Sequence, residues 1–406
     1  MSKKFDSKKL PNLDIRTTSI SKQLFPPTKP LNVGNIREDG FYIVDMGTVE
    51  DQHSKFIDLM PRVKPFYAMK CFPDKHVIQK LMNLGTGFDC ASLEEIKTVL
   101  EIANGTHVDI IFANPCKLIS HLQFAKDHGV DVMTFDNIDE LYKIKMIHPL
   151  AKLVLRIRTD DSKAKCKLGI KYGAQLSSVS EILLKAIDLD LQVIGVSFHV
   201  GSGCFDATAF SDALRASRQV FNIAASLGLK FSFLDIGGGF PGSKADGLSI
   251  ENVAKSVNPL LEQLFPECDI IAEPGRYYVS AACTLFTPVI GRRVVHYDGD
   301  DESVSSKNNV IVPLPKDQIP EEITNYENVQ KGDVINASQV VRNEQPGFMY
   351  YISEGTYGAF NCVYFDHAEI VPHVLTRYHQ LVDNVLDRLG VPESAYKQFS
   401  MYFELI

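Results

Sequence analysis

The residues that could do chemistry lie where short apolar runs of the sequence end. Lys70 ends the run PFYAMK, and His199 ends the run GVSFH just before a turn bounded by glycines. Three glycines, Gly237 to Gly239, follow the run FLDI, and Glu273 follows DIIA within the segment AEPGR. Each has an ordinary interpretation: a surface lysine, a structural histidine, a loop that needs positive φ, and a solvent-exposed acid. Together they place an amine, an imidazole, a backbone loop and a carboxylate at the ends of short apolar runs.

These four groups match the needs of a single cofactor. A lysine whose pKa is lowered by its surroundings can form a Schiff base with an aldehyde. Bared backbone N–H groups of a glycine loop can bind a phosphate, to which Arg276 and Ser202 could add contacts. The Pro-Gly turn after Glu273 would fix a carboxylate that keeps a pyridine nitrogen protonated, and the His199 ring could stack on that pyridine. The set predicts pyridoxal phosphate; no Walker lysine follows the glycines, so a P-loop is not expected.

Eight short runs rich in β-branched and aromatic residues must position these groups. Each is followed by a stretch with helical spacing, such as KHVIQKLMNL from Lys75 to Leu84, and Ser92 with Glu95 forms a capping-box pattern. Strands that alternate with helices predict a parallel sheet, and eight of them predict a closed (β/α)8 barrel with its functional side chains at the C-terminal strand ends. The runs begin at Phe66, Gly87, Val108, Asp131, Lys152, Val193, Phe231 and Asp269.

The rest of the sequence predicts a second, mostly β domain built from both ends of the chain. We assign residues 44–283 to the cofactor-binding barrel and residues 20–43 plus 284–370 to the β domain. A long acidic and polar insertion at 297–345 interrupts the β domain, as expected of a surface loop. Residues 371–406, which include VLTRYHQLVDNVLDRLG, are predicted to form a helical tail.

Composition excludes several classes of protein. The 406 residues are 45% hydrophobic and 23% charged, which is typical of globular proteins, and the net charge of −8 gives no attraction to nucleic acid or to an anionic membrane. No run approaches the ~18 apolar residues of a transmembrane helix, and the N-terminus lacks the apolar core of a signal peptide. The eight cysteines include no C-x-x-C pair, which indicates reduced thiols and no metal site. We therefore expect a cytoplasmic protein.

Eight segments occur in order between about residue 30 and Ala368: PFYAMKC, GTGFDCAS, IFANPCK, LVLRIRTDDSKAKCKLGIKYGA, GVSFHVGSGC, LDIGGGFPG, AEPGRYYV and YGAFNCVYFDHA. Together they closely resemble the eukaryotic ornithine decarboxylase family, which belongs to the alanine-racemase-like (fold-type III) pyridoxal-phosphate enzymes. The resemblance implies a (β/α)8 barrel, a β domain of modified Greek-key type and a head-to-tail homodimer with shared active sites. It implies decarboxylation of L-ornithine to putrescine, the first step of polyamine biosynthesis, and an antizyme-type regulatory protein as a partner.

The resemblance also implies roles for particular residues. Catalysis would fall to Lys70, which carries the Schiff base, to His199, which stacks on the ring, and to Glu273, which pairs with the pyridine nitrogen. The phosphate would be held by Ser202, Gly238, Gly239 and Arg276. The supporting polar set around the cofactor would be Asp89, Glu95 and Arg156. The substrate's distal amino group would be bound by Tyr357 and Asp366.

One family segment has no counterpart in this chain. The family places Trp-Gly-Pro-Thr-Cys-Asp about two dozen residues after the match to YFDHA; its cysteine acts in protonation at Cα, and its aspartate completes the partner subunit's substrate pocket. The chain contains no tryptophan, and no cysteine follows Cys362. We therefore expect slow turnover by this chain. Two alternatives stay open: another basic amino-acid decarboxylase, acting on arginine, lysine or diaminopimelate, and a catalytically impaired regulator that binds the enzyme's partners.

Overall fold

The computed structural model describes most of the predicted barrel and short parts of the remaining chain. The described residues are 40–166, 168–169, 171–242, 248–287, 289–295, 347–354, 360, 371–374 and 401–404. The predicted insertion at 297–345 lies outside them, as do Tyr357 and Asp366, the two residues expected to bind the substrate.

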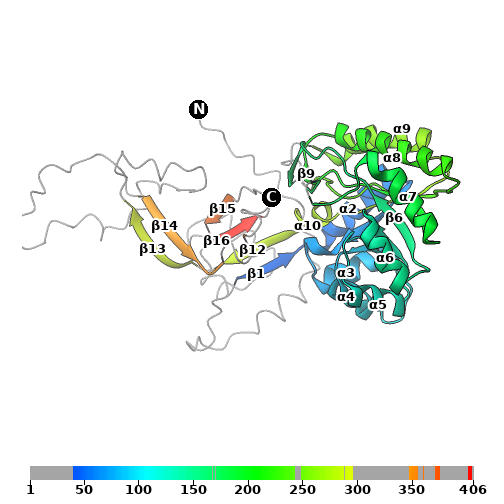
Figure 1. Ribbon diagram of the computed structural model, residues 1–406. Coiled ribbons are helices and arrows are strands. Elements are labelled where there is room, and N and C mark those ends of the chain that lie inside the picture. The colour runs from blue at the N-terminus through cyan, green and yellow to red at the C-terminus, as the bar shows by residue number, and fades with distance from the viewer. Residues whose placement is uncertain are drawn as a thin grey trace, which may run out of the picture.

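Eight parallel strands close into a barrel that helices surround on the outside (Figure 1). Each barrel strand pairs with the next along the chain, and the last pairs with the first, which closes the ring. All eight overlap the runs identified in the sequence, so the predicted (β/α)8 barrel is confirmed. The strands are β2 (Val63–Ala68), β3 (Gly87–Cys90), β4 (Ile110–Phe112), β5 (Val132–Phe135), β6 (Lys152–Arg156), β8 (Gln192–Ser197), β10 (Phe233–Asp235) and β11 (Asp269–Ala272).

The helices form where the sequence has helical spacing, and each buries its apolar stripe. In α3, for example, Val77, Ile78 and Leu81 are buried on one face. No described helix combines the length and hydrophobicity that a bilayer crossing requires. The helices are α2 (Met46–Leu59), α3 (Lys75–Asn83), α4 (Leu93–Ala103), α5 (Ile119–Asp127), α6 (Ile138–Ile147), α7 (Val179–Asp188), α8 (Thr208–Ser226), α9 (Ile250–Leu264) and α10 (Arg276–Val279), with the 3-10 turns η2 (Met69–Cys71) and η3 (Leu176–Ser178).

The inside of the barrel changes from apolar to polar toward the C-terminal ends of the strands. Phe66, Ile111, Val154 and Ile271 pack together in one buried cluster. Side chains alternate along a strand, so the residues two positions after Val154 and Ile271 project into the barrel again, at its C-terminal mouth. Those positions are Arg156 and Glu273. Residues paired across parallel strands share a face, and Arg156 pairs with Ser197, which pairs with Asp235.

A separate sheet joins segments from both ends of the chain. It is antiparallel and has the order β1 (Phe41–Val44), β12 (Cys283–Thr287), β16 (Met401–Glu404) and β15 (Val371–Val374). Figure 1 shows β1 and β12 side by side, leading away from the barrel. Two antiparallel pairs complete the described strands: β13 (Val289–Val295) with β14 (Gly347–Ile352), and β7 (Ala164–Cys166) with β9 (Ser202–Cys204). The domain boundaries given above remain predictions.

The described part of the predicted helical tail is extended. Residues 371–374 and 401–404 form β15 and β16, so the prediction of helix is wrong for these two stretches. Their backbone groups pair across the sheet with one another, and β16 also pairs with β12. The backbone N–H and C=O groups of these residues therefore form their hydrogen bonds within the sheet, instead of within the helix that the local spacing of apolar residues predicts.

Candidate active site

Lys70 stands at the mouth of the barrel beside a buried carboxylate. It lies in η2, two residues beyond the last residue of β2, and its Nζ donates a hydrogen bond of 2.6 Å to Oδ2 of Asp89 on β3. The Asp89 side chain is fully buried, whereas that of Lys70 is half exposed. Desolvation lowers the pKa of Lys70, but the negative charges of Asp89 and Glu273 outweigh it and raise that pKa above its ordinary value. The expected lowering of the lysine pKa is therefore wrong, because a carboxylate faces the ammonium.

Glu273 and Asp235 form a buried pair of carboxyl groups on neighbouring strands. Asp235 is the last residue of β10, Glu273 directly follows β11, and both are almost entirely buried. Burial raises the pKa of both groups, and the charge of Asp235 raises that of Glu273 further. The pKa of Asp235 reaches about 7. Glu273 is predicted from the sequence but Asp235 is not, although the alternation of side chains from Ile271, which faces inward, and from Phe233 on β10 points to both positions.

His199 is held as a neutral imidazole. It lies two residues after β8, and its Nδ1 accepts a hydrogen bond of 2.9 Å from the backbone N–H of Gly201. Desolvation first, then the positive charges of Arg156 and Lys70, lower the pKa of His199 well below 6.5. Since Nδ1 accepts, the proton of the neutral ring is on Nε2. A Cβ added to Gly238 would lie 2.8 Å from that Nε2, so the glycine loop passes directly against the imidazole.

The glycine loop and Arg276 lie at a second edge of the same mouth. Arg276 opens α10, and its Nη2 donates a hydrogen bond of 3.2 Å to Ser202 Oγ on β9. The two residues predicted to share a phosphate are thus brought together. Gly239 has φ +105°, and a Cβ there would lie 2.6 Å from the carbonyl oxygen of Gly201. Within the described residues, the N–H groups of Gly238 and Gly239 donate no backbone hydrogen bond, which leaves them available to an anion.

Glu95 supports the mouth from the helix that follows β3. Ser92 caps α4 by accepting the N–H of Glu95 at 3.3 Å, and Glu95 Oε2 accepts the N–H of Ala91 at 2.5 Å. The predicted capping box is therefore present, with the carboxylate one residue further back than in the usual pattern. Burial raises the pKa of Glu95. Asn114 donates to the carbonyl of the same Ala91 at 3.2 Å, so the ends of β3 and β4 are tied together.

Arg156 completes the predicted polar set. It is the last residue of β6, and its guanidinium lies over the ring of Tyr172, 5.3 Å from the centroid. Its positive charge contributes to the lowered pKa of His199 and partly offsets the raised pKa values of Asp235 and Glu273. Arg156 therefore supplies the mouth with a second positive charge beside that of Lys70.

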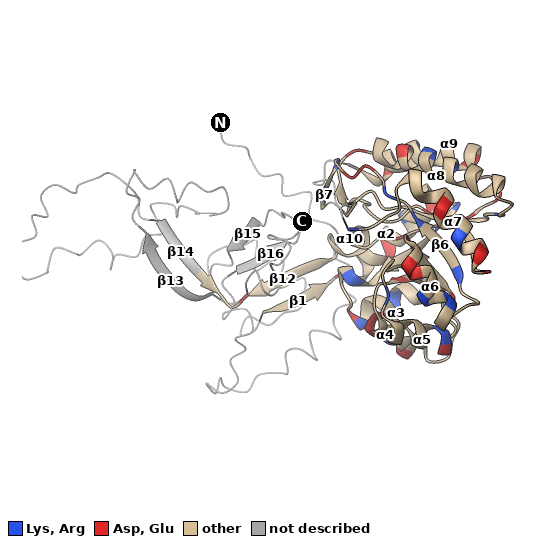
Figure 2. Cartoon of the chain, viewed as in Figure 1, with Lys and Arg blue, Asp and Glu red and all other residues tan. Residues whose placement is uncertain are grey.

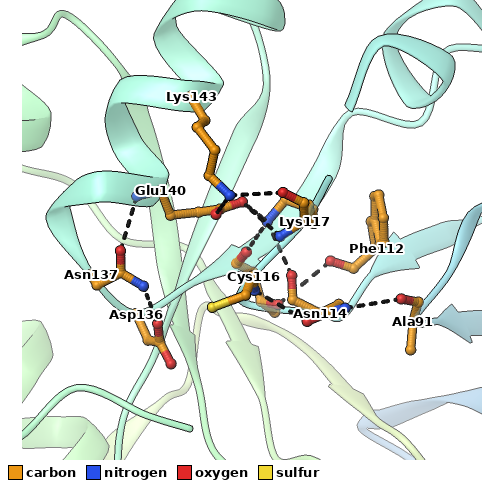
Figure 3. Close-up of polar contacts among 10 residues, drawn as sticks. Ala91, Phe112, Asn114, Cys116, Lys117, Asp136, Asn137, Glu140 and Lys143 are labelled. Carbon is orange, nitrogen blue, oxygen red and sulfur yellow. Dashed lines mark hydrogen bonds and ion pairs between the residues drawn. The ribbon is translucent and has the colours of Figure 1, made fainter. Parts of the chain in front are cut away.

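A buried lysine locks the rim between β4 and β5. Figure 3 shows Lys117 surrounded by oxygen atoms: its Nζ lies 2.9 Å from Glu140 Oε1, 2.6 Å from the carbonyl of Thr134 and 3.1 Å from that of Asn114. Lys143 pairs with the other oxygen of Glu140 at 2.5 Å. Burial is the main cause that lowers the pKa of Lys117, and Glu140 opposes it. Lys117 has no role predicted from the sequence, because nothing in the local sequence pattern sets it apart from a surface lysine.

The residues at the mouth fit pyridoxal phosphate. Three buried side-chain atoms there have no hydrogen-bond partner among the described residues: Asp89 Oδ1, Ser197 Oγ and Asp235 Oδ2. Buried polar groups are normally paired, so Asp89 Oδ1 and Ser197 Oγ indicate a place for a polar ligand or water, whereas Asp235 Oδ2 belongs to the carboxyl group that faces Glu273. An amine, a carboxyl pair, a neutral imidazole and an open backbone loop with an arginine are the groups that this cofactor uses for its aldehyde, pyridine nitrogen, ring face and phosphate.

Comparisons with known proteins agree with this arrangement. Residues 46–280 match the family described as "Pyridoxal-dependent decarboxylase, pyridoxal binding domain". Ornithine decarboxylase of Mus musculus is 41% identical over 342 residues, covering 82% of this chain and 65% of the mouse protein. Antizyme inhibitor 2 of Xenopus laevis is 43% identical over 338 residues, covering 82% of this chain and 66% of that protein. The chain thus spans slightly less than two thirds of the length of these relatives.

A solved structure extends the comparison to three dimensions. The arginine decarboxylase of Paramecium bursaria Chlorella virus superposes with a TM-score of 0.69 and 34% sequence identity, covering 89% of this chain and 83% of the viral enzyme. The likeness includes the barrel and reaches beyond the residues that the family match covers.

Proposed function

Because the chain belongs to the pyridoxal-dependent decarboxylase family, whose cofactor is pyridoxal phosphate, we propose that it decarboxylates L-ornithine to putrescine. The observation that carries the proposal is the meeting of Lys70, Asp89 and the Asp235–Glu273 pair at one barrel mouth. The 41% identity to an ornithine decarboxylase favours ornithine. The 34% identity to a viral arginine decarboxylase keeps arginine as the rival substrate.

We assign the cofactor contacts as follows. Lys70 would bond the aldehyde carbon, Glu273 would face the pyridine nitrogen and His199 the ring. The phosphate would be bound by Ser202, Gly238, Gly239 and Arg276, and the surrounding polar set would be Asp89, Glu95 and Arg156. When bound, the cofactor supplies an electron sink for the electron pair left at the substrate's Cα when carbon dioxide departs.

The chain's own residues prepare this chemistry through their protonation states. Lys70 is an ammonium and must lose a proton before it can bond carbon, and Asp89 Oδ2, 2.6 Å away, is the nearest acceptor. The Glu273 carboxylate would hold a proton on the ring nitrogen, which keeps the ring electron-withdrawing. His199 is neutral and so adds no positive charge beside that cationic ring.

The substrate's distal amino group would be bound by Tyr357 and Asp366, which lie outside the described residues. A carboxylate at position 366 would favour a cationic side chain, because an unpaired buried ammonium is costly. We also propose a homodimer with shared active sites and a cytoplasmic location. In the view of Figure 2, positions of Lys and Arg alternate with positions of Asp and Glu along the described outer helices.

The test is turnover and covalent labelling of the purified chain. Ornithine, arginine and lysine would each be supplied with pyridoxal phosphate, and the amine products measured by mass spectrometry, with Lys70→Ala as the inactive control. Borohydride reduction should leave a pyridoxyl group on Lys70. Labelling without any amine product would reject the decarboxylase and keep the cofactor.

A second function is supported by one comparison. Antizyme inhibitor 2 of Xenopus laevis is as similar to this chain as the ornithine decarboxylases are. A regulator that binds an antizyme-type protein is therefore the alternative from another class. Tight binding of purified antizyme by a chain that turns over none of the three amino acids would establish it; turnover without that binding would exclude it.

A further inference from the structure

Asp235 connects the two ends of the proposed cofactor site. Its Oδ1 accepts the backbone N–H of Gly237 at 2.8 Å, and the carbonyl oxygen of Gly237 accepts the backbone N–H of Glu273 at 2.7 Å. Gly237 is the first residue of the glycine loop assigned to the phosphate, and Glu273 is the group assigned to the ring nitrogen. One residue is therefore bonded both to Asp235 and to the segment that carries Glu273.

Gly237 has little freedom to move within this arrangement. Its φ is +63°, and a Cβ there would lie 2.0 Å from the carbonyl oxygen of Phe198, so another residue would not fit. A shift of the Asp235 carboxylate would consequently be passed to the loop and to the backbone of Glu273.

The second oxygen of Asp235 lacks a donor. Oδ2 is buried without a hydrogen-bond partner among the described residues, although the Glu273 carboxyl group is within hydrogen-bonding reach of the Asp235 side chain. Two ionised carboxylates cannot hydrogen-bond to each other, whereas one proton between them would satisfy both.

The charges of the neighbouring residues also favour one proton bound between Asp235 and Glu273. Lys70 on η2 and Arg156 on β6 face the pair with two positive charges, and Asp89 on β3 adds a third carboxylate to Asp235 and Glu273. Carboxyl groups therefore outnumber the cations around the pair, which favours a bound proton. His199 is neutral, and Glu95 on α4 faces Asp89 and Lys70.

We propose that Asp235 and Glu273 share one proton in the cofactor-free protein, and that the cationic ring nitrogen of the cofactor takes the place of this proton. In that exchange the shared O–H bond breaks and its proton passes to water. Both carboxyl groups are then anions: Asp235 stays bonded to Gly237, and Glu273 faces the ring N–H. Asp235 is thus a positioning residue that acts through Glu273 and Gly237. The inference rests on the cofactor part of the proposed function and does not depend on decarboxylation.

The test counts the protons released on binding. Pyridoxine 5′-phosphate has the ring and the phosphate but no aldehyde, so it leaves Lys70 unbonded. Calorimetric titration of the cofactor-free chain in two buffers of different ionisation enthalpy gives the proton count. Near pH 6 the wild type should release up to one proton more than Asp235→Asn, in which Glu273 has lost its proton-sharing partner and the charge that further raises its pKa, so that less of it is protonated before binding. The difference should vanish above pH 8.

Because binding releases a proton, the affinity for pyridoxine 5′-phosphate should depend on pH. The dissociation constant of the wild type should rise relative to that of Asp235→Asn by up to tenfold for each pH unit below 7. Asn can still accept the Gly237 N–H, so the variant should fold; should it not, Glu273→Gln must abolish the same proton release. Asp269→Asn, at the exposed opposite end of β11, is the matched control and should behave as the wild type.

Equal proton counts for the wild type and both variants at pH 6 would overturn the inference. So would the absence, in the cofactor-free wild type at pH 6, of an infrared band of a protonated carboxyl group that either variant removes. Neither result depends on turnover, so a failure here is distinguishable from a failure of the proposed decarboxylation.

Discussion

Lys70 and Asp89 form an ion pair of 2.6 Å in which the carboxylate is fully buried and the ammonium reaches the barrel mouth. The pair explains why the pKa of Lys70 is raised even though desolvation acts in the opposite direction. A protonated amine is a poor nucleophile, so Lys70 must lose a proton before it can react with the cofactor.

Replacing Asp89 by Asn should therefore lower the pKa of Lys70, because desolvation remains while the main attractive charge is removed. We expect the amount of pyridoxyl-Lys70 that borohydride traps after a short reaction time to increase with pH. This increase should occur at lower pH in Asp89→Asn than in the wild type. Mass spectrometry across pH 6 to 10 measures this. Asp127→Asn, an exposed carboxylate on α5, is the control; a profile unchanged by Asp89→Asn would contradict the assignment.

Glu273→Gln should reduce the decarboxylation rate more than it reduces cofactor affinity. A neutral amide cannot hold the ring nitrogen protonated, so the loss should amount to on the order of a few kcal/mol in the activation free energy. Steady-state rates and the dissociation constant of pyridoxal phosphate must both be measured, in a form with measurable turnover. An unchanged rate would show that Glu273 has another role.

Two opposing titrations should set the pH dependence of the stability of the cofactor-free protein. The folded-state pKa of Asp235 is raised from 3.8 to about 7, so its contribution to stability is complete below pH 4 and is lost as the pH rises to 7. The loss is at most about 4 kcal/mol, from about 1.4 kcal/mol per pKa unit. The pKa of His199 is lowered, so its contribution is present above pH 6.5 and lost below it. Urea unfolding from pH 4 to 8 tests this: the two trends should offset each other between pH 4 and 6.5 in the wild type, whereas Asp235→Asn should show mainly the rise in stability with pH that His199 causes.

Lys117→Met should destabilise the barrel by about 3 kcal/mol, because it leaves the buried Glu140 with Lys143 as its remaining ionic partner. Lys117→Arg, which keeps the charge, should cost less. The matched control is Lys97→Met, which breaks a surface pair with Glu94 and should change the free energy of unfolding by less than about 1 kcal/mol. Denaturant midpoints at constant m-value provide the comparison. Equal effects of Lys117→Met and Lys97→Met would mean that the buried network contributes no more than a surface pair.

The 406-residue chain should turn over ornithine slowly. It lacks a Trp-Gly-Pro-Thr-Cys-Asp segment, which in the family supplies a cysteine for protonation at Cα and an aspartate to the substrate pocket. Charge-assisted contacts are each worth roughly 1.5–3 kcal/mol, so losing two would reduce kcat/KM by about a hundredfold or more. Steady-state kinetics against a family enzyme assayed in parallel would check this, and comparable kcat/KM values would contradict it.

The alternation of apolar runs with helical stretches was enough to predict the barrel, since strand and helix periodicities are local properties of the sequence. The position of Lys70, His199 and Glu273 just after such runs was enough to predict that they meet, because the strands of a closed parallel barrel all end at one face. The capping box at Ser92 was equally local.

Only the tertiary structure decided how the charges are paired. In the sequence, Asp235 is an ordinary residue of an apolar run, and closure of the barrel places it beside Glu273. Lys117 is indistinguishable from a surface lysine in the sequence, and the structure shows it buried against Glu140 of α6. The pKa of Lys70 was predicted in the wrong direction for the same reason. Electrostatic interactions depend on distances between residues far apart in the chain and on their burial, and closure of the barrel determines both.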